Sequence, residues 1–360
     1  MSAIIHPRPN PIVAAMYTAR DMDVDVIVIH GPAGCSFMAS RPLENAGVHV
    51  VTSAMKDRDL IFGGASPLEN ALKEARDRFH PKVVAVVSTC ASTIIGDDVD
   101  AIIKRVDMGG AKCFAIDAHG CMENNTDGAV KALEAGADAG IIPREEYVRQ
   151  TSLLKAATDL ERARGMAGKT YLKPAVSPTK YAVCKRIIET LSAGGKVSVA
   201  MIAKKELAYR FADMFLAVDE ARRRYGGEVR YIANMDPGLG LPRIRRYVAE
   251  IDRDLEAGGV RIHDVIGGLD EYAIVGDRMR KRIDSFAPDL RIFMGICHSY
   301  PDIREGDILI TDQPRELANY LNQGLSAVGE ISSHSMVMGA TGIVRLETAD
   351  TLRDMMERSL

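Results

Sequence analysis

The sequence predicts an α/β protein made of consecutive Rossmann-like, doubly wound domains with mostly parallel sheets. Short runs rich in β-branched residues alternate with amphipathic helical segments along most of the chain. Several of the runs end in a turn that contains glycine, serine or cysteine. The length of 360 residues is enough for two or three such domains.

The first part of the chain predicts four strands and the helices between them. The strands are expected at residues 24–30, 49–52, 82–87 and 112–116. The sequence Ser66-Pro67-Leu68-Glu69 combines a capping box with proline at the first helical position, so a helix should begin there. A second helix should follow Asp97 and Asp98, whose charges suit a helix N-terminus.

The later part of the chain repeats this alternation. Strands are expected at residues 197–203, 229–235, 272–275, 291–296 and 307–311, with amphipathic helices at 207–218 and 241–255. The charged stretch 143–180, which contains Pro174 and Pro178, is interpreted as a linker. The expected domains are therefore residues 1–165, which would bind a cluster, 166–265 and 266–360.

Composition and charge narrow the functional classes. Hydrophobic residues make up 47% and charged residues 26%, which is typical of a globular protein and excludes disorder. A net charge of −3 argues against a nucleic-acid or anionic-membrane binder. The apolar runs are strand-sized, and no basic flank leads into an apolar stretch at the N-terminus. A cytoplasmic location is expected.

Three of the six cysteines have a shared position. Cys35, Cys90 and Cys121 each come shortly after a predicted strand, at the edge where parallel sheets bind ligands. Cys113 and Cys184 lie in apolar segments and are expected to be buried thiols. Soft thiolates along one edge, in a chain without a Cys-x-x-Cys pair, suggest an iron–sulfur cluster.

Two segments resemble nucleotide-binding loops only superficially. Gly168-Lys169-Thr170 lacks the first glycine of a phosphate loop, since Ala163 occupies that position, and it does not follow a strand. The segment 238–240 lacks the third glycine of a dinucleotide site, where Arg243 stands. We therefore expect no nucleotide site on this chain.

Four short segments resemble the catalytic-component subunits of nitrogenase and its relatives. They are residues 30–35 (HGPAGC), 61–64 (IFGG), 88–90 (STC) and 94–98 (IIGDD), all within the first 130 or so positions. A later echo is residues 330–335, where His334 takes the place of a histidine that ligates the active-site metal cofactor in the nitrogenase α-subunit. The resemblance implies a nitrogenase-component-like fold and an oxidoreductase.

The departures from this family predict a smaller cluster. No cysteine precedes Cys35, so an eight-iron cluster would lack some of its thiolates. A 4Fe–4S cluster needs about four thiolates. Two subunits that each contribute Cys35 and Cys90 would supply them, which predicts a homodimer with one shared cluster. Cys121 is a third candidate ligand, with packing beside the cluster as its alternative role.

The resemblance to the compact members of this family also implies a reaction and a partner. The reaction is reduction of Ni-sirohydrochlorin a,c-diamide with formation of a lactam ring, so that a nickel tetrapyrrole is the substrate. A separate ATP-hydrolysing iron–sulfur reductase would dock transiently and deliver electrons. ATP and Mg²⁺ would then be bound by this partner and not by this chain. The expected docking surface includes residues 38–42 and 91–97.

Several residues in the later domains are candidates for handling the substrate. Proton donors are expected among His334, His298 and Asp236, with His263 as a further candidate, because each electron must be matched by a proton. Arginines are expected to hold the acidic groups of the tetrapyrrole; they are Arg243, Arg245 and Arg246.

Three other functions remain open. The first is a cofactor-assembly scaffold that holds a cluster for transfer, and the second is a chlorophyll-type reductase subunit. Both are expected to need a distinct second subunit, and scaffold subunits are also longer. The third is a redox-sensing or electron-transfer protein without a substrate pocket, and a tetrapyrrole-binding titration would distinguish it.

Overall fold

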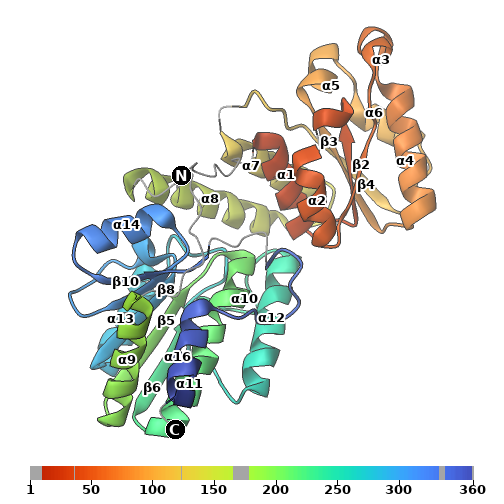
Figure 1. The fold of residues 1–360 in the computed structure, drawn as a ribbon. Helices are drawn as coiled ribbons and strands as arrows, with labels where there is room; N and C mark the ends of the chain where they lie inside the picture. The colour runs from red at the N-terminus through yellow and green to blue at the C-terminus, as the bar shows by residue number, and fades with distance from the viewer. Residues whose placement is uncertain (1–9, 36, 123, 165–177, 332–336, 359–360) are drawn as a thin grey trace. The chain divides into compact units, whose positions relative to one another are not determined.

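A computed structural model describes residues 10–35, 37–122, 124–164, 178–331 and 337–358 (Figure 1). The chain forms two compact units. Of the described residues, the N-terminal unit comprises those in 10–155 and 241–243, and the C-terminal unit comprises those in 156–240 and 244–358. Each unit contains one parallel sheet with helices packed against it, which confirms the predicted α/β class.

The N-terminal unit contains a four-stranded parallel sheet in the order β2-β1-β3-β4. Its strands are β1 (Val26–His30), β2 (His49–Thr52), β3 (Val83–Ser88) and β4 (Lys112–Ile116). They match the four predicted strands to within a residue or two. Strand β1 is buried along its whole length, as expected for a β-branched run in the middle of a parallel sheet.

Helices pack against this sheet. The helices of this unit are α1 (Pro11–Asp21), α2 (Phe37–Asn45), α3 (Asp57–Phe62), α4 (Ala65–Phe79), α5 (Cys90–Ile95), α6 (Val99–Arg105) and α7 (Asn125–Asp138), with a short 3-10 helix η1 (Ala33–Cys35). A further helix, α8 (Arg144–Arg164), has residues in both units. Leu68 and Leu72 of α4 pack with Ile102 of α6 in one buried cluster with β1 and β3. The N-cap of helix α4 is Gly64, two residues before the predicted cap at Ser66. Asp98 caps α6 as predicted.

The C-terminal unit contains a six-stranded parallel sheet in the order β10-β9-β8-β5-β6-β7. Its strands are β5 (Lys196–Ile202), β6 (Glu228–Ala233), β7 (Asp264–Val265), β8 (Leu290–Gly295), β9 (Ile308–Thr311) and β10 (Ser326–Gly329). The chain adds strands on one side of β5 and then returns to add β8, β9 and β10 on the other side. The point of reversal between β5 and β8 is where doubly wound sheets bind ligands.

The helices of this unit are α9 (Pro178–Ser192), α10 (Ala208–Phe211), α11 (Asp213–Tyr225), α12 (Pro242–Ala257), α13 (Gly276–Phe286), α14 (Pro314–Asn322) and α16 (Glu347–Arg358), with 3-10 turns η2 (Lys205–Leu207) and η3 (Cys297–Ser299). Among the described residues, none of the helices combines the length and apolar character that crossing a membrane requires.

The structure differs from the expected division into three domains. Strands from the predicted second and third domains belong to a single sheet, in which Val199 of β5 pairs with Ile292 of β8. Local alternation predicts strands but not their pairing, so the boundary at residue 265 had no physical counterpart. Residues 272–275 are also not a strand. The strand that follows β6 along the chain is β7, which pairs with β6 at the edge of the sheet. The predicted linker region contains α8 and the start of α9.

Candidate functional site

The three predicted cluster ligands follow three neighbouring strands of the N-terminal sheet. Cys35 ends the turn η1 after β1, Cys90 begins α5 after β3, and Cys121 follows β4. The sulfur atoms of Cys90 and Cys121 lie 3.7 Å apart. Cys35 and Cys121 are exposed, and Cys90 is partly exposed. The carboxyl edge of this sheet therefore presents sulfur at its surface.

Two glycines allow the chain to form this edge. Thr89 Oγ1 donates a hydrogen bond to the His30 carbonyl oxygen at 2.9 Å, and a Cβ atom at Gly31 would overlap this hydroxyl. The ends of β1 and β3 can approach each other only because Gly31 has no side chain. On the other side, the Gly120 N–H donates to Cys90 Sγ at 3.2 Å.

The electrostatics of the thiols suit binding of a cationic group. Partial burial and the neighbouring Cys90 raise the pKa of Cys35. The hydrogen bond with Cys90 and its charge raise the pKa of Cys121. Two thiolates in contact repel each other, and an iron–sulfur cluster bound between them would offset that repulsion. The soft sulfur donors fit an iron–sulfur cluster, to which Cys35, Cys90 and Cys121 would contribute.

The remaining metal-binding side chains and thiols were compared with this edge. Within the described ranges no group of three or more histidine, cysteine or acidic side chains could hold a single metal ion. Of the other thiols, Cys184 is fully buried as predicted, whereas Cys113 on β4 is only half-buried. Burial raises the pKa of both thiols to about 12, so they stay protonated.

A buried histidine–aspartate pair, His30 and Asp97, supports the same edge. The sequence analysis did not identify this pair. His30 Nε2 lies 3.0 Å from Asp97 Oδ2, and His30 Nδ1 lies 3.1 Å from Ser53 Oγ. Both Asp97 oxygens accept the Gly64 N–H at 3.1 Å. Burial lowers the pKa of His30, while Asp97 opposes this shift. The pair ties the α3–α4 turn and the α5–α6 turn to the end of β1.

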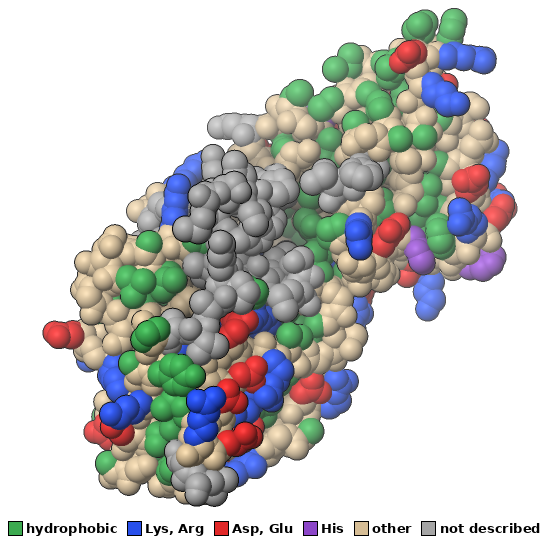
Figure 2. All heavy atoms as spheres, viewed as in Figure 1, with side chains coloured by type: hydrophobic (Ala, Val, Ile, Leu, Met, Phe, Trp, Pro, Cys, Tyr) green, Lys and Arg blue, Asp and Glu red, His purple; other side chains and the backbone are tan. Residues whose placement is uncertain are grey.

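Two helices of the N-terminal unit, α3 and α5, carry exposed apolar side chains. Ile61 and Phe62 on α3 are 76% and 80% exposed, and Ile94 on α5 is 82% exposed. Figure 2 shows hydrophobic side chains at the end of the N-terminal unit that carries α3 and α5. Ile94 falls within the predicted docking segment 91–97. The side chain of Met38, in the other predicted docking segment, lies outside the described residues.

The predicted substrate arginines lie on α12. Arg243 donates hydrogen bonds to the carbonyl oxygens of Arg20 at 3.1 Å and Ala46 at 2.6 Å, so its guanidinium already has partners. Arg245 and Arg246 are exposed on the first turns of the helix.

The predicted proton donors are dispersed. Asp236 follows β6, where its carboxylate accepts the Gly238 N–H at 2.8 Å and stabilises a turn. His298 follows β8 in η3 and is 6% exposed. Its Nδ1 lies 3.2 Å from Glu316 Oε1. His334 lies outside the described residues. The sequence offered no sign that Glu316, a residue in the first turn of α14, would contact His298.

A lysine that sequence analysis missed follows β5. Lys204 Nζ lies 3.4 Å from the Tyr272 hydroxyl, which donates to Glu161 Oε1 at 3.1 Å. The nearby Tyr272 and Glu161 oxygens raise the pKa of Lys204 despite its burial. This cation therefore stays charged at the carboxyl edge of the C-terminal sheet. Only its position after a strand could have indicated it.

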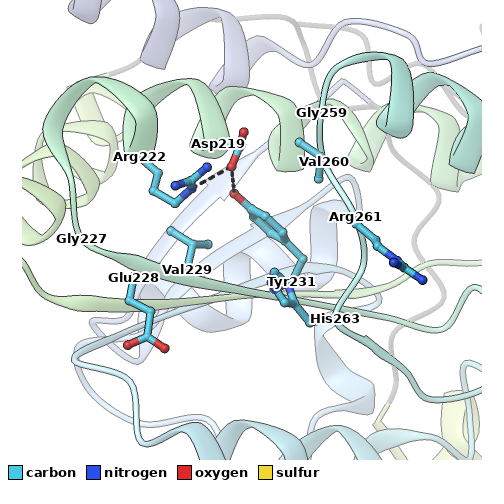
Figure 3. A pocket seen from close by; sticks show the side chains of 10 residues that line it. All are labelled: Asp219, Arg222, Gly227, Glu228, Val229, Tyr231, Gly259, Val260, Arg261 and His263. Atoms are coloured by element: carbon cyan, nitrogen blue, oxygen red, sulfur yellow. Dashed lines mark hydrogen bonds and ion pairs between the residues drawn. The ribbon is translucent and has the colours of Figure 1, made fainter.

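A cavity of about 320 Å³ lies at the opposite edge of this sheet, beside the amino ends of β6 and β7 (Figure 3). Arg222 and Tyr231 point toward Asp219 in its wall, at 2.8 Å and 3.0 Å. His263 lines the cavity, and its Nδ1 accepts the Tyr231 N–H at 3.0 Å. Because parallel sheets bind ligands at their carboxyl ends, the location of His263 does not match its expected role.

Known proteins of one family are similar to this chain over nearly its whole length. The family described as "Nitrogenase component 1 type Oxidoreductase" matches residues 11–215. The chain is 42% identical to a Methanosarcina acetivorans protein named "Ni-sirohydrochlorin a,c-diamide reductive cyclase complex, component CfbD", over 98% of this chain and 97% of that protein. A Methanothermobacter thermautotrophicus protein of the same name is 40% identical, over 97% and 98% of the two chains.

Solved structures of nitrogenase are more distant. One described as "Nitrogenase Cp1 at pH 5" aligns with 99% of this chain and 88% of that chain, at 14% identity and a TM-score of 0.36.

Proposed function

The chain belongs to the family of nitrogenase component 1 type oxidoreductases, and from this premise we propose that it reduces Ni-sirohydrochlorin a,c-diamide with closure of a lactam ring. Support comes from two relatives whose names state this complex and which match over nearly their full lengths. In this proposal the nickel tetrapyrrole is the substrate, and the product is a precursor of a nickel coenzyme.

The exposed sulfur edge is the observation that carries the proposal. Cys35 and Cys90 of two subunits would hold one 4Fe–4S cluster, with Cys121 as a further ligand or a packing neighbour. When bound, the cluster supplies one-electron transfer. The protein residues position the thiols, since Gly31 and Gly120 let the loops approach and the His30–Asp97 pair fixes the surrounding turns.

A partner reductase would bring the electrons. Docking on the apolar surface of Ile61, Phe62 and Ile94 would place it beside the sulfur edge, and desolvation of these side chains would stabilise the complex. The chain offers no convincing phosphate loop, so ATP and Mg²⁺ are assigned to the partner.

The tetrapyrrole would bind at the carboxyl edge of the C-terminal sheet. Its carboxylates need cations, for which we propose Arg245, Arg246 and Lys204. His298, His334 and Asp236 are the proposed proton donors.

The test uses anaerobically purified protein. We expect about two irons and two sulfides per chain on a dimer, as one shared 4Fe–4S cluster requires. With an ATP-hydrolysing reductase of the nitrogenase type and Ni-sirohydrochlorin a,c-diamide, absorbance and mass should report a reduced, cyclised product. Binding of the tetrapyrrole without any turnover would instead indicate a different reaction, and absence of iron after reconstitution would exclude the electron-transfer role.

A further inference from the structure

A buried carboxylate contacts His298 at the carboxyl edge of the C-terminal sheet. Glu316, on α14, is 0% exposed. Its Oε1 accepts hydrogen bonds from the His298 backbone N–H and from the Tyr320 hydroxyl at 2.9 Å. Its Oε2 accepts the Thr311 hydroxyl at 2.7 Å. These donors fix the carboxylate so that Oε1 also lies 3.2 Å from His298 Nδ1.

This contact determines which nitrogen of His298 carries hydrogen. A carboxylate can only accept hydrogen bonds, so Nδ1 must be the protonated nitrogen that faces Glu316. The other nitrogen, Nε2, is buried and has no hydrogen-bond partner among the described residues. A buried polar atom without a partner is unfavourable, so it requires a compensating role.

The position of His298 indicates what that role is. His298 follows β8, and β8 pairs with β5 at the point where the strand order of the sheet reverses. Doubly wound sheets bind their ligands outside the carboxyl ends of the strands at such a point. Lys204 follows β5 at the same edge, so the ends of the two central strands carry an imidazole and an ammonium group.

We propose that Glu316 and His298 form a carboxylate–imidazole pair in which His298 Nε2 exchanges a proton with the tetrapyrrole and Glu316 positions the ring. The assignment rests on the proposed function and selects His298 from its candidate proton donors. Glu316 acts through His298 and is a positioning residue.

The proton step balances with the electron that the reductase supplies. In protonated His298 the Nε2–H bond breaks, its electron pair stays on nitrogen, and the proton bonds to the reduced macrocycle. A proton that originates from solvent then restores the Nε2–H bond. Glu316 holds the ring through its contact with Nδ1, and it keeps Nε2 oriented in both states.

Three variants of the full-length protein test this pair. His298→Gln should lower turnover by about 100-fold, the usual scale of a lost general acid, and leave the affinity for the tetrapyrrole nearly unchanged. Glu316→Gln should give a smaller loss in the same parameter. His298→Ala should regain part of its activity when imidazole is added, which a purely structural defect would not. His263→Gln at the opposite edge of the sheet is the matched histidine control.

Two further measurements separate the possible outcomes. The iron content and the spectrum of the reductase-reduced cluster should be the same in all variants, so that any loss lies after electron delivery. If the wild-type protein turns over and the His298 variants turn over equally fast, His298 is not the proton donor, and the proposed function remains intact. If His298→Gln and His263→Gln lose activity equally, or if imidazole restores none, the pair is structural. Absence of turnover in the wild-type protein would refute the proposed function itself.

Discussion

The two sheets of the molecule share a parallel, helix-covered construction, but their carboxyl edges are opposite in character. The N-terminal edge exposes Cys35 and Cys121 together with Phe62, which is 80% exposed. The C-terminal edge buries a polar pair, with His298 at 6% and Glu316 at 0% exposure. An exposed edge suits exchange of electrons with other molecules, and an enclosed edge suits positioning of protons. The residues that follow the strands, and not the sheet itself, make the two edges different.

Removal of a cysteine from the exposed edge should have the largest effect. Cys90→Ala should lose the cluster and the reductase-dependent turnover, because the proposed cluster would lose one of its four thiolates. Iron and sulfide analysis and the absorbance of the anaerobic protein measure this.

Two other cysteines sharpen the result. Cys113→Ala, on β4 of the same sheet, should retain its iron, since this thiol stays protonated within the fold. Cys121→Ala distinguishes ligand from neighbour: loss of iron would make Cys121 a ligand and contradict a cluster held by Cys35 and Cys90 of two subunits alone.

Backbone geometry at the same edge should matter almost as much. Gly31→Ala introduces a Cβ that overlaps the Thr89 hydroxyl, so the loops of Cys35 and Cys90 must separate. We expect a folded protein with a largely lost cluster, measured by circular dichroism and iron content. Gly34→Ala is the matched control because its Cβ would have no neighbour within 4 Å among the residues that the structure describes. Equal iron content in the two variants would contradict the role of Gly31.

These edges differ in how far the sequence predicted them. The strands and the cysteines after them could be predicted, because β-branched runs and turn residues are local signals. The pairing of β5 with β8 could not, since it joins segments far apart in the chain. The same holds for Glu316 and His298, or for His30 and Asp97, whose contacts depend on how strands and helices pack. The three-domain expectation failed for this reason.

Loss of the apolar surface should weaken binding of the partner reductase without affecting the cluster. Phe62→Ser and Ile94→Ser each remove a large exposed side chain that docking would bury, so the reductase concentration for half-maximal turnover should rise about tenfold. Turnover as a function of reductase concentration measures this, with iron content as the internal reference.

Val148→Ser provides the control for this surface. Val148 is 56% exposed on α8 of the same unit, away from the α3 and α5 segments in the sequence. A comparable rise in all three variants would mean that lost hydrophobicity, and not this surface, changes the kinetics. No rise in Phe62→Ser or Ile94→Ser would place the reductase elsewhere.

The smallest effects should be opposite responses of the two units to mild acid. His30 has a lowered pKa in the N-terminal unit, so the stability it contributes is present above its ordinary pKa of 6.5 and is lost as pH falls below that value. Asp252 on α12 has a pKa raised to about 6 by burial and by Glu256. Its contribution is therefore present below an unfolded pKa of 3.8 and is lost as pH rises through 6.

Asp252→Asn isolates the second response. The substitution should stabilise the protein at pH 8 by about 1 kcal/mol, less than the full linkage value because Asp252 is half-exposed, and should change little at pH 4. Urea unfolding from pH 4 to 8 measures the free energy, with His30→Gln expected to flatten the slope below pH 6.5. A gain from Asp252→Asn that is equal at all pH values would show that shape, and not charge, determines the stability there. Relative to the wild-type protein, the two variants should change the pH dependence of the free energy of unfolding in opposite directions. This result would mean that the N-terminal unit depends on a neutral histidine, while the C-terminal unit tolerates a carboxylate whose charge burial disfavours.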